Sequence, residues 1–142
     1  MAHKRKSIRA SIVTELINAA TAAGSNVFNS RSIPLFDDQM PSICVYTLSE
    51  QIVEPLSNVR ILRDLFVRVE GAIEKNNTEN FADTLDDLAE EIEAALNSFT
   101  PGCANSEMEL QRTDIEYKND GERTKAAISL TYNVKYATNK GD

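Results

Sequence analysis

The sequence predicts an α+β fold, a single-layer antiparallel-rich β-sheet with two α-helices packed on one face. Two segments carry apolar residues at helical spacing, and several others alternate apolar and polar residues as strands do. An Asp-Gly pair near the C-terminus marks a hairpin between two long strands. The order is therefore helix, two or three strands, helix and two strands. With 142 residues, the chain is expected to form a single domain over residues 1–142.

The first half of the chain predicts one helix followed by the first strands of the sheet. The expected elements are a helix over residues 7–23, a short strand over 27–31, and stronger strands over 43–48 and 61–73. Gly24 supplies a stop for the helix. Leu65, Val67 and Val69 share one face of the last strand, which indicates that this face is buried.

A second helix is expected from Thr78, which would act as its N-cap, to about Ser98. Its apolar stripe is Phe81, Leu85, Leu88, Ile92 and Leu96. Acidic residues occupy most of the remaining surface of this helix. Pro101 and Gly102 then end the helical region.

The last third of the chain predicts a hairpin that turns at Asp120-Gly121. After the turn, apolar residues alternate without interruption, so Ile128 and Leu130 are expected in the core. Before the turn the alternation changes parity, which a bulge near Arg112-Thr113 would repair. The expected opposed pairs are then Ile115 with Ala126, Leu110 with Leu130, and Met108 with Tyr132.

The net charge of −7 limits the partners that the chain can bind. A protein that holds nucleic acid by its phosphates normally presents a basic surface, so stable DNA binding is not expected. No apolar run approaches the ~20 residues of a membrane span, and no apolar signal core follows the basic N-terminus. Cys44, Cys103 and His3 supply too few ligands for a structural zinc site, and both cysteines are expected to be free thiols.

Glu116 and Lys118 are the strongest candidates for catalytic residues. A Glu-x-Lys pair on a strand is half of a metal-dependent nuclease site, and alternation places both side chains on one face. The other half is an Asp at the end of a neighbouring strand, but Asp114 lies on the same strand. The sequence therefore favours a solvent-exposed face beside a turn, with no catalytic, cofactor-binding or metal-binding residue.

Lys4, Arg5, Lys6 and Arg9 form a basic cluster near the N-terminus. A solvated tail is the simpler interpretation, with His3 in a frayed terminus. The alternative is a contact with an acidic neighbour, for example the acidic helix of another copy of the chain.

The connection before the strand over 43–48 is too apolar for a solvated loop. It either packs on its own sheet or is covered by a partner. The candidate residues for an oligomer or partner interface are Arg31, Ile33, Pro34, Leu35, Phe36, Met40 and Pro41.

The same connection leads into a recognisable order of residues. An Arg and a Pro-Leu pair precede Met-Pro-x-Ile-x-Val-Tyr and a Glu, here Arg31, Pro34-Leu35, residues 40–46 and Glu50. A strand over residues 65–70 and a helix with Leu85-Asp86 then follow. This order resembles the phage tail terminator family, typified by the lambda-type minor tail protein U.

The resemblance implies a structural phage or prophage protein without catalytic activity or cofactor. Such proteins form a hexameric ring that caps the tail tube, stops its polymerisation and provides the head-joining surface. The implied partners are other copies of the chain, the tail tube protein and a head-completion or connector protein, while DNA passes without specific binding. The implied location is the host cytoplasm during assembly and the head-proximal end of the virion tail. A head–tail connector, or a nuclease using Glu116 and Lys118, is the alternative.

Overall fold

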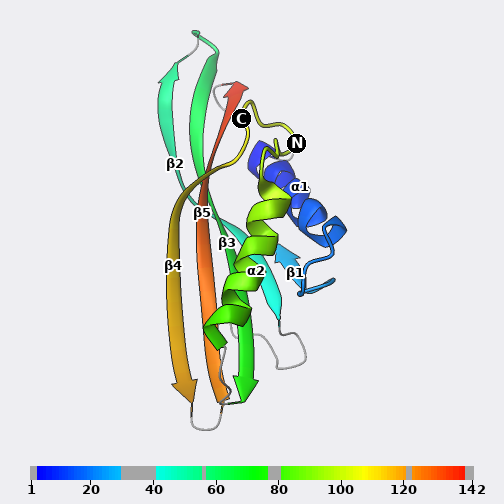
Figure 1. The fold of residues 1–142 in the computed structure, drawn as a ribbon. Helices are drawn as coiled ribbons and strands as arrows, with labels where there is room; N and C mark the ends of the chain where they lie inside the picture. The colour runs from blue at the N-terminus through cyan, green and yellow to red at the C-terminus, as the bar shows by residue number, and fades with distance from the viewer. Residues whose placement is uncertain (1–2, 30–40, 56, 77–80, 121–122, 140–142) are drawn as a thin grey trace.

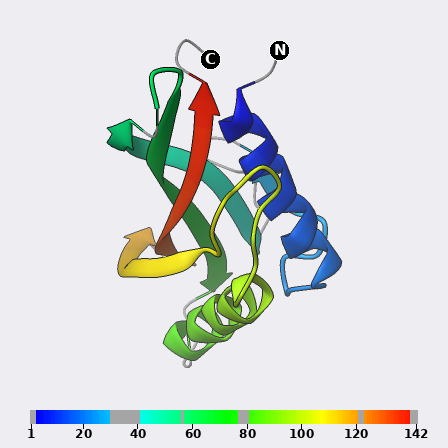
Figure 2. The ribbon, with the colours of Figure 1, turned by 90° about the horizontal axis from the view of Figure 1, so that it is seen from above.

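The computed structural model describes residues 3–29, 41–55, 57–76, 81–120 and 123–139, and it confirms the α+β fold. Within these ranges, five strands form one sheet in the order β1-β2-β3-β5-β4, and both helices lie on one side of it (Figures 1 and 2). β1 is parallel to β2, whereas the other neighbouring strands are antiparallel. The elements are α1 (Lys4–Asn18), β1 (Val27–Asn29), β2 (Ser42–Pro55), β3 (Arg60–Asn76), α2 (Phe81–Leu96), β4 (Glu109–Asp120) and β5 (Arg123–Asn139).

The first helix, α1, begins and ends earlier than the expected range of residues 7–23. His3 is its N-cap, because the Nδ1 atom of His3 accepts a hydrogen bond from the Arg5 backbone N–H at 3.2 Å. The helix ends before Ala20, which has a left-handed backbone with φ of 54°. Gly24, with φ of 58°, lies in the turn that follows instead of at the helix end. His3 is therefore part of a defined helix start, so the expectation of a frayed terminus was wrong.

The hydrophobic core fills the space between the sheet and the two helices. The helices contribute buried side chains to this core, namely Ile8, Ile12 and Leu16 of α1 and Leu85, Leu88, Ile92 and Leu96 of α2. These residues recur at helical spacing, which is why each helix buries one stripe. The stripe predicted for the second helix is thus confirmed at its described side chains, whereas Ile17 of α1 is 41% exposed.

Gly71 in β3 allows α2 to approach the sheet closely. A Cβ atom placed on this glycine would lie 2.9 Å from Leu88 Cδ2 and 3.3 Å from Ile92 Cδ1. The first distance is shorter than ordinary carbon–carbon contacts, so a side chain here would force Leu88 and Ile92 of α2 to shift.

We expect Gly71→Val to lower the free energy of unfolding by about 1–3 kcal/mol, because the added methyl groups overpack the α2 contact. Urea denaturation followed by circular dichroism measures the change. Gly102→Val is the matched control, since a Cβ at Gly102 meets only Ser11 atoms at 3.8 Å. Equal effects of the two substitutions would show that the close α2 approach does not depend on Gly71.

Strands β2 and β3 are both longer than the expected 43–48 and 61–73. In β2, two bulges interrupt the alternation that marks a strand. The pairing with β3 shifts at Leu48 and again at Val53, which are the extra residues on β2. Each extra residue reverses the side-chain parity, so the pattern along β2 no longer reads as one strand.

The predicted register of the β4–β5 hairpin was wrong by two residues. Ile115 pairs with Ile128 instead of Ala126, because Asp120 is still paired, with Arg123, and belongs to the strand. The predicted bulge exists, but it lies between Leu110 and Arg112, one to two residues before the expected place. Leu110 pairs with Tyr132 instead of Leu130. Met108, which was expected to pair with Tyr132, precedes the strand. A shift of two residues keeps every side chain on its face. Ile128 and Leu130 are therefore buried, as predicted.

Among the described residues, no helix combines the length and apolarity needed to cross a membrane. Neither Cys44, which is buried in β2, nor Cys103, which is exposed, is in a disulfide bond. Cys103 has a left-handed backbone with φ of 72°, in the connection between α2 and β4.

Candidate interaction surfaces

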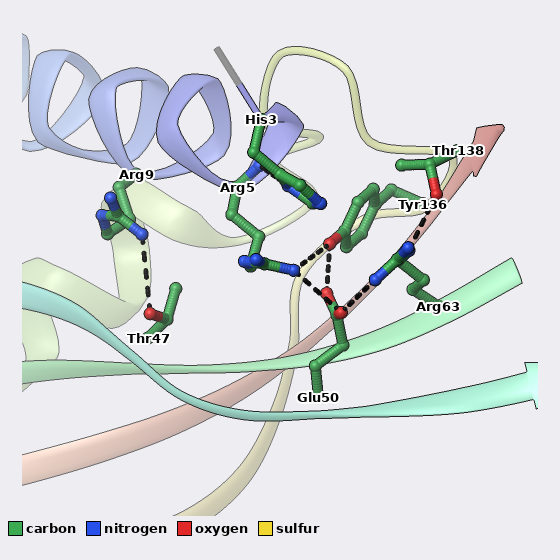
Figure 3. A network of polar contacts seen from close by, with 8 residues as sticks. All are labelled: His3, Arg5, Arg9, Thr47, Glu50, Arg63, Tyr136 and Thr138. Atoms are coloured by element: carbon green, nitrogen blue, oxygen red, sulfur yellow. Dashed lines mark hydrogen bonds and ion pairs between the residues drawn. The ribbon is translucent and has the colours of Figure 1, made fainter. Parts of the chain in front are cut away.

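A charged cluster centred on Glu50 of β2 joins α1 to the sheet (Figure 3). The Oε2 atom of Glu50 lies 2.9 Å from Arg5 Nη1 of α1 and 2.7 Å from Arg63 Nη1 of β3. The Oε1 atom accepts a hydrogen bond from the hydroxyl of Tyr136 in β5. Arg63 also donates from Nε to Thr138 Oγ1 at 2.7 Å. One carboxylate thus connects one helix and three strands.

The environment of this cluster keeps Glu50 ionised and Tyr136 protonated. Burial raises the pKa of the Glu50 carboxyl, but hydrogen bonds from Tyr136, Arg63 and Arg5 outweigh it, so the net pKa lies below its ordinary value. Burial, followed by the hydrogen bond to Glu50, raises the pKa of Tyr136 to about 12. The Glu50 and Arg63 side chains are each 13% exposed, so the cluster is a structural contact with little surface for a partner.

The basic cluster near the N-terminus is part of α1 and is not a solvated tail. Lys4 Nζ donates to the Ala137 carbonyl at 2.8 Å. Arg9 donates from Nε to Asn29 Oδ1 at 3.1 Å and from Nη1 to Thr47 Oγ1 at 3.5 Å. Lys6 is exposed on the helix. Contacts within the chain therefore engage much of this cluster and leave Lys6 at the surface.

Of the residues considered for metal-dependent chemistry, Asp114 and Glu116 lie on the sheet face opposite the helices. Glu116 is exposed and, with Asp114 and Arg68, borders a hollow of about 720 Å³. Arg112 Nε contacts both Asp114 carboxylate oxygens, at 3.0 and 2.9 Å, in an exposed ion pair. The side chain of Lys118 lies outside the described part of the chain. Among the described residues, no group of three or more His, Cys, Asp or Glu side chains is placed to hold a metal ion.

Two exposed apolar regions lie where the helices do not cover the sheet. The β2–β3 hairpin extends past α1 at one end of the molecule (Figure 1), and Ile52 and Val59 there are 54% and 63% exposed. At the sheet edge, Leu110, Ile115 and Tyr117 of β4 are also exposed. Sequence reasoning missed both regions, because local alternation does not reveal where a covering helix ends.

The predicted interface residues fall mostly outside the described ranges, namely Arg31, Ile33, Pro34, Leu35, Phe36 and Met40. Pro41 is described; it is half-buried, and its carbonyl accepts a hydrogen bond from Asn26 Nδ2 at 3.5 Å. The interface over these residues remains a prediction.

Comparison with known proteins supports a structural role for this chain. No curated protein matches the sequence. A chain of the solved structure described as "Virion of native gene transfer agent (GTA) particle" shares the fold, with a TM-score of 0.55 and 9% sequence identity over 92% of this chain and 96% of that chain. The family described as phage minor tail protein U matches residues 3–136. The chain therefore belongs to the phage minor tail protein U family and is a structural protein of a phage tail.

Proposed function

We propose that this chain is a tail terminator, which caps the tail tube as a hexameric ring, stops tube polymerisation and provides the surface that joins the head. The observation that carries the proposal is the family match over residues 3–136. The protein would assemble in the host cytoplasm and remain at the head-proximal end of the virion tail. In this role it catalyses nothing and needs no cofactor.

The exposed apolar regions support an assembled state. Ile52, Val53 and Val59 are all at least 46% exposed at one hairpin end, and Tyr117 of the edge strand β4 is 54% exposed. Apolar side chains gathered at an end and an edge of a protein are typical of contact surfaces. Contacts between unlike patches of identical subunits close into a ring when the rotation permits it.

The acidic balance of the chain supports the passage of DNA through such a ring. With a net charge of −7, the subunit repels phosphates over distances of about a Debye length. DNA would consequently slide through without specific binding, which is the expected behaviour at the head-proximal end of a tail.

The segment of residues 31–41 is proposed as part of the interface with the neighbouring subunit or the tube. Its apolar residues are Ile33, Leu35, Phe36 and Met40, and the two prolines restrict its backbone. Burying a Leu or a Phe contributes about 1.5–3 kcal/mol each, which is enough to hold an ordered segment on a partner.

The test adds purified protein to the polymerising tail tube protein and measures tube length by electron microscopy. Wild-type protein should cap the tubes and shorten them, whereas Leu35→Ser with Phe36→Ser should lose capping because the apolar contact is removed. Thermal unfolding of the dilute double mutant is the control for its fold. If the wild type leaves tube length unchanged and binds the head connector instead, the protein is a head–tail connector.

A further inference from the structure

A shallow groove of about 430 Å³ runs between α2 and the edge strand β4. Its floor is apolar, with Met108 and Tyr132 buried and Leu110 40% exposed. Its rim is acidic, with Glu90 and Glu93 of α2 both exposed to solvent. This combination suits a surface that carries both aliphatic and positively charged side chains.

The acidic rim has no positive charge to balance it on its own helix. α2 contains no Lys or Arg, and Asp83, Asp86 and Asp87 are exposed along with the two glutamates of the rim. Glu107, just before β4, and Glu109, its first residue, are also exposed. Burial raises the pKa of the Tyr132 hydroxyl, and the negative charge of Glu93 raises it further. The Glu93 carboxylate therefore affects the ionisation of a residue in the groove floor. A cationic partner would relieve this accumulation of like charge.

The outward face of α1 has the opposite character. Lys6, Ala10, Thr14 and Ile17 are all exposed, and their spacing of three and four residues places them along one face of the helix. The basic residues of α1 lie in its first half, whereas Ile17, 41% exposed, lies in the last turn. This face therefore offers positive charge and apolar surface together.

The two surfaces lie on different sides of the molecule. β4 is the strand at one edge of the sheet, whereas α1 packs on β1 and β2 near the other edge. In Figure 1, α2 stands between α1 and β4, and no residue of α1 lines the groove. One copy can therefore use both surfaces at once, with a different neighbour on each.

We propose that the α2–β4 groove binds the outward face of α1 from a second copy of this chain, so that Glu90 and Glu93 meet Lys6 and Leu110 packs near Ile17. This contact is heterologous, since each copy contributes its groove to one neighbour and its α1 face to the other. The inference rests on the proposed ring and names the surfaces that would build it.

Charge reversal on each surface tests the contact. Glu90→Lys with Glu93→Lys makes the groove basic, and Lys6→Glu with Ala10→Glu makes the α1 face acidic. Because like charges across an interface cost several kcal/mol, each double mutant alone should lose at least about tenfold of its hexamer, measured by native mass spectrometry. Asp86→Lys with Asp87→Lys is the matched control, since it changes the net charge of α2 equally at exposed positions outside the groove.

An equimolar mixture of the two double mutants should recover the hexamer. In an alternating ring, every reversed groove meets a reversed α1 face, and every unchanged groove meets an unchanged one. Recovery also shows that both mutants are folded. The inference is wrong if either double mutant assembles like the wild type, or if mixing restores nothing. If the wild type forms no ring even on the tail tube, the terminator proposal itself fails, which is a distinguishable result.

Discussion

Leu130→Ala is expected to lower the free energy of unfolding by about 2–5 kcal/mol, the usual cost of a cavity in a packed core. Leu130 is 0% exposed in β5, where it pairs with Val69 on one side and Thr113 on the other. Strands β3 and β5 are long and each is paired on both sides, so the site has little freedom to collapse. Urea denaturation of the dilute protein, followed by circular dichroism, measures the loss.

Leu110→Ala is the matched control, because the same substitution is made on the neighbouring strand at a side chain that is 40% exposed. Its expected cost is below about 1 kcal/mol, since little buried volume is lost. If Leu130→Ala costs no more than this control, the helix-covered face of β5 is not the packed core that the structure describes.

Glu50→Ala is expected to lower the free energy of unfolding by about 2–4 kcal/mol, because it leaves the Arg5 and Arg63 guanidinium groups without their shared carboxylate. The substitution also removes the acceptor for the Tyr136 hydroxyl. Glu116→Ala is the matched control, since Glu116 is exposed on β4 and should change stability by less than about 0.5 kcal/mol. Thermal and urea unfolding of both variants give the comparison.

The effect of Glu50→Ala should depend on pH. The pKa of Glu50 is lowered in the folded state, so the carboxylate stabilises the fold above the ordinary Glu pKa, and this stability is lost as pH falls through the lowered value. The difference in unfolding free energy between the wild type and Glu50→Ala should therefore be largest near pH 7 and shrink below roughly pH 4. A difference that stays constant from pH 7 to pH 3 would contradict the role of the ionised carboxylate.

Much of the fold follows from local patterns in the sequence. The stripe from Leu85 to Leu96 marks α2, and the alternation around Val67 and Leu130 marks two central strands. These predictions succeed because each side chain's burial repeats with the period of its own helix or strand. The family resemblance carried by residues 31–50 was likewise a property of a short continuous segment, and the family match confirms it.

Other features depend on which strands and helices become neighbours. Glu50 meets Arg5 and Tyr136 across 45 and 86 residues of sequence, and no local pattern predicts either contact. Leu48 and Val53 interrupt the alternation of β2 only because bulges place them between its pairs with β3.

The exposure of Ile115 and Tyr117 is the clearest example of a feature that the tertiary structure decided. Their alternation resembles that of the buried residues on β5, and their side chains lie on the same face of the sheet. Strand order places β4 at the edge, and α2 packs on β3 and β5. Whether an alternating strand is buried depends on what covers it, and that covering comes from segments distant in the sequence.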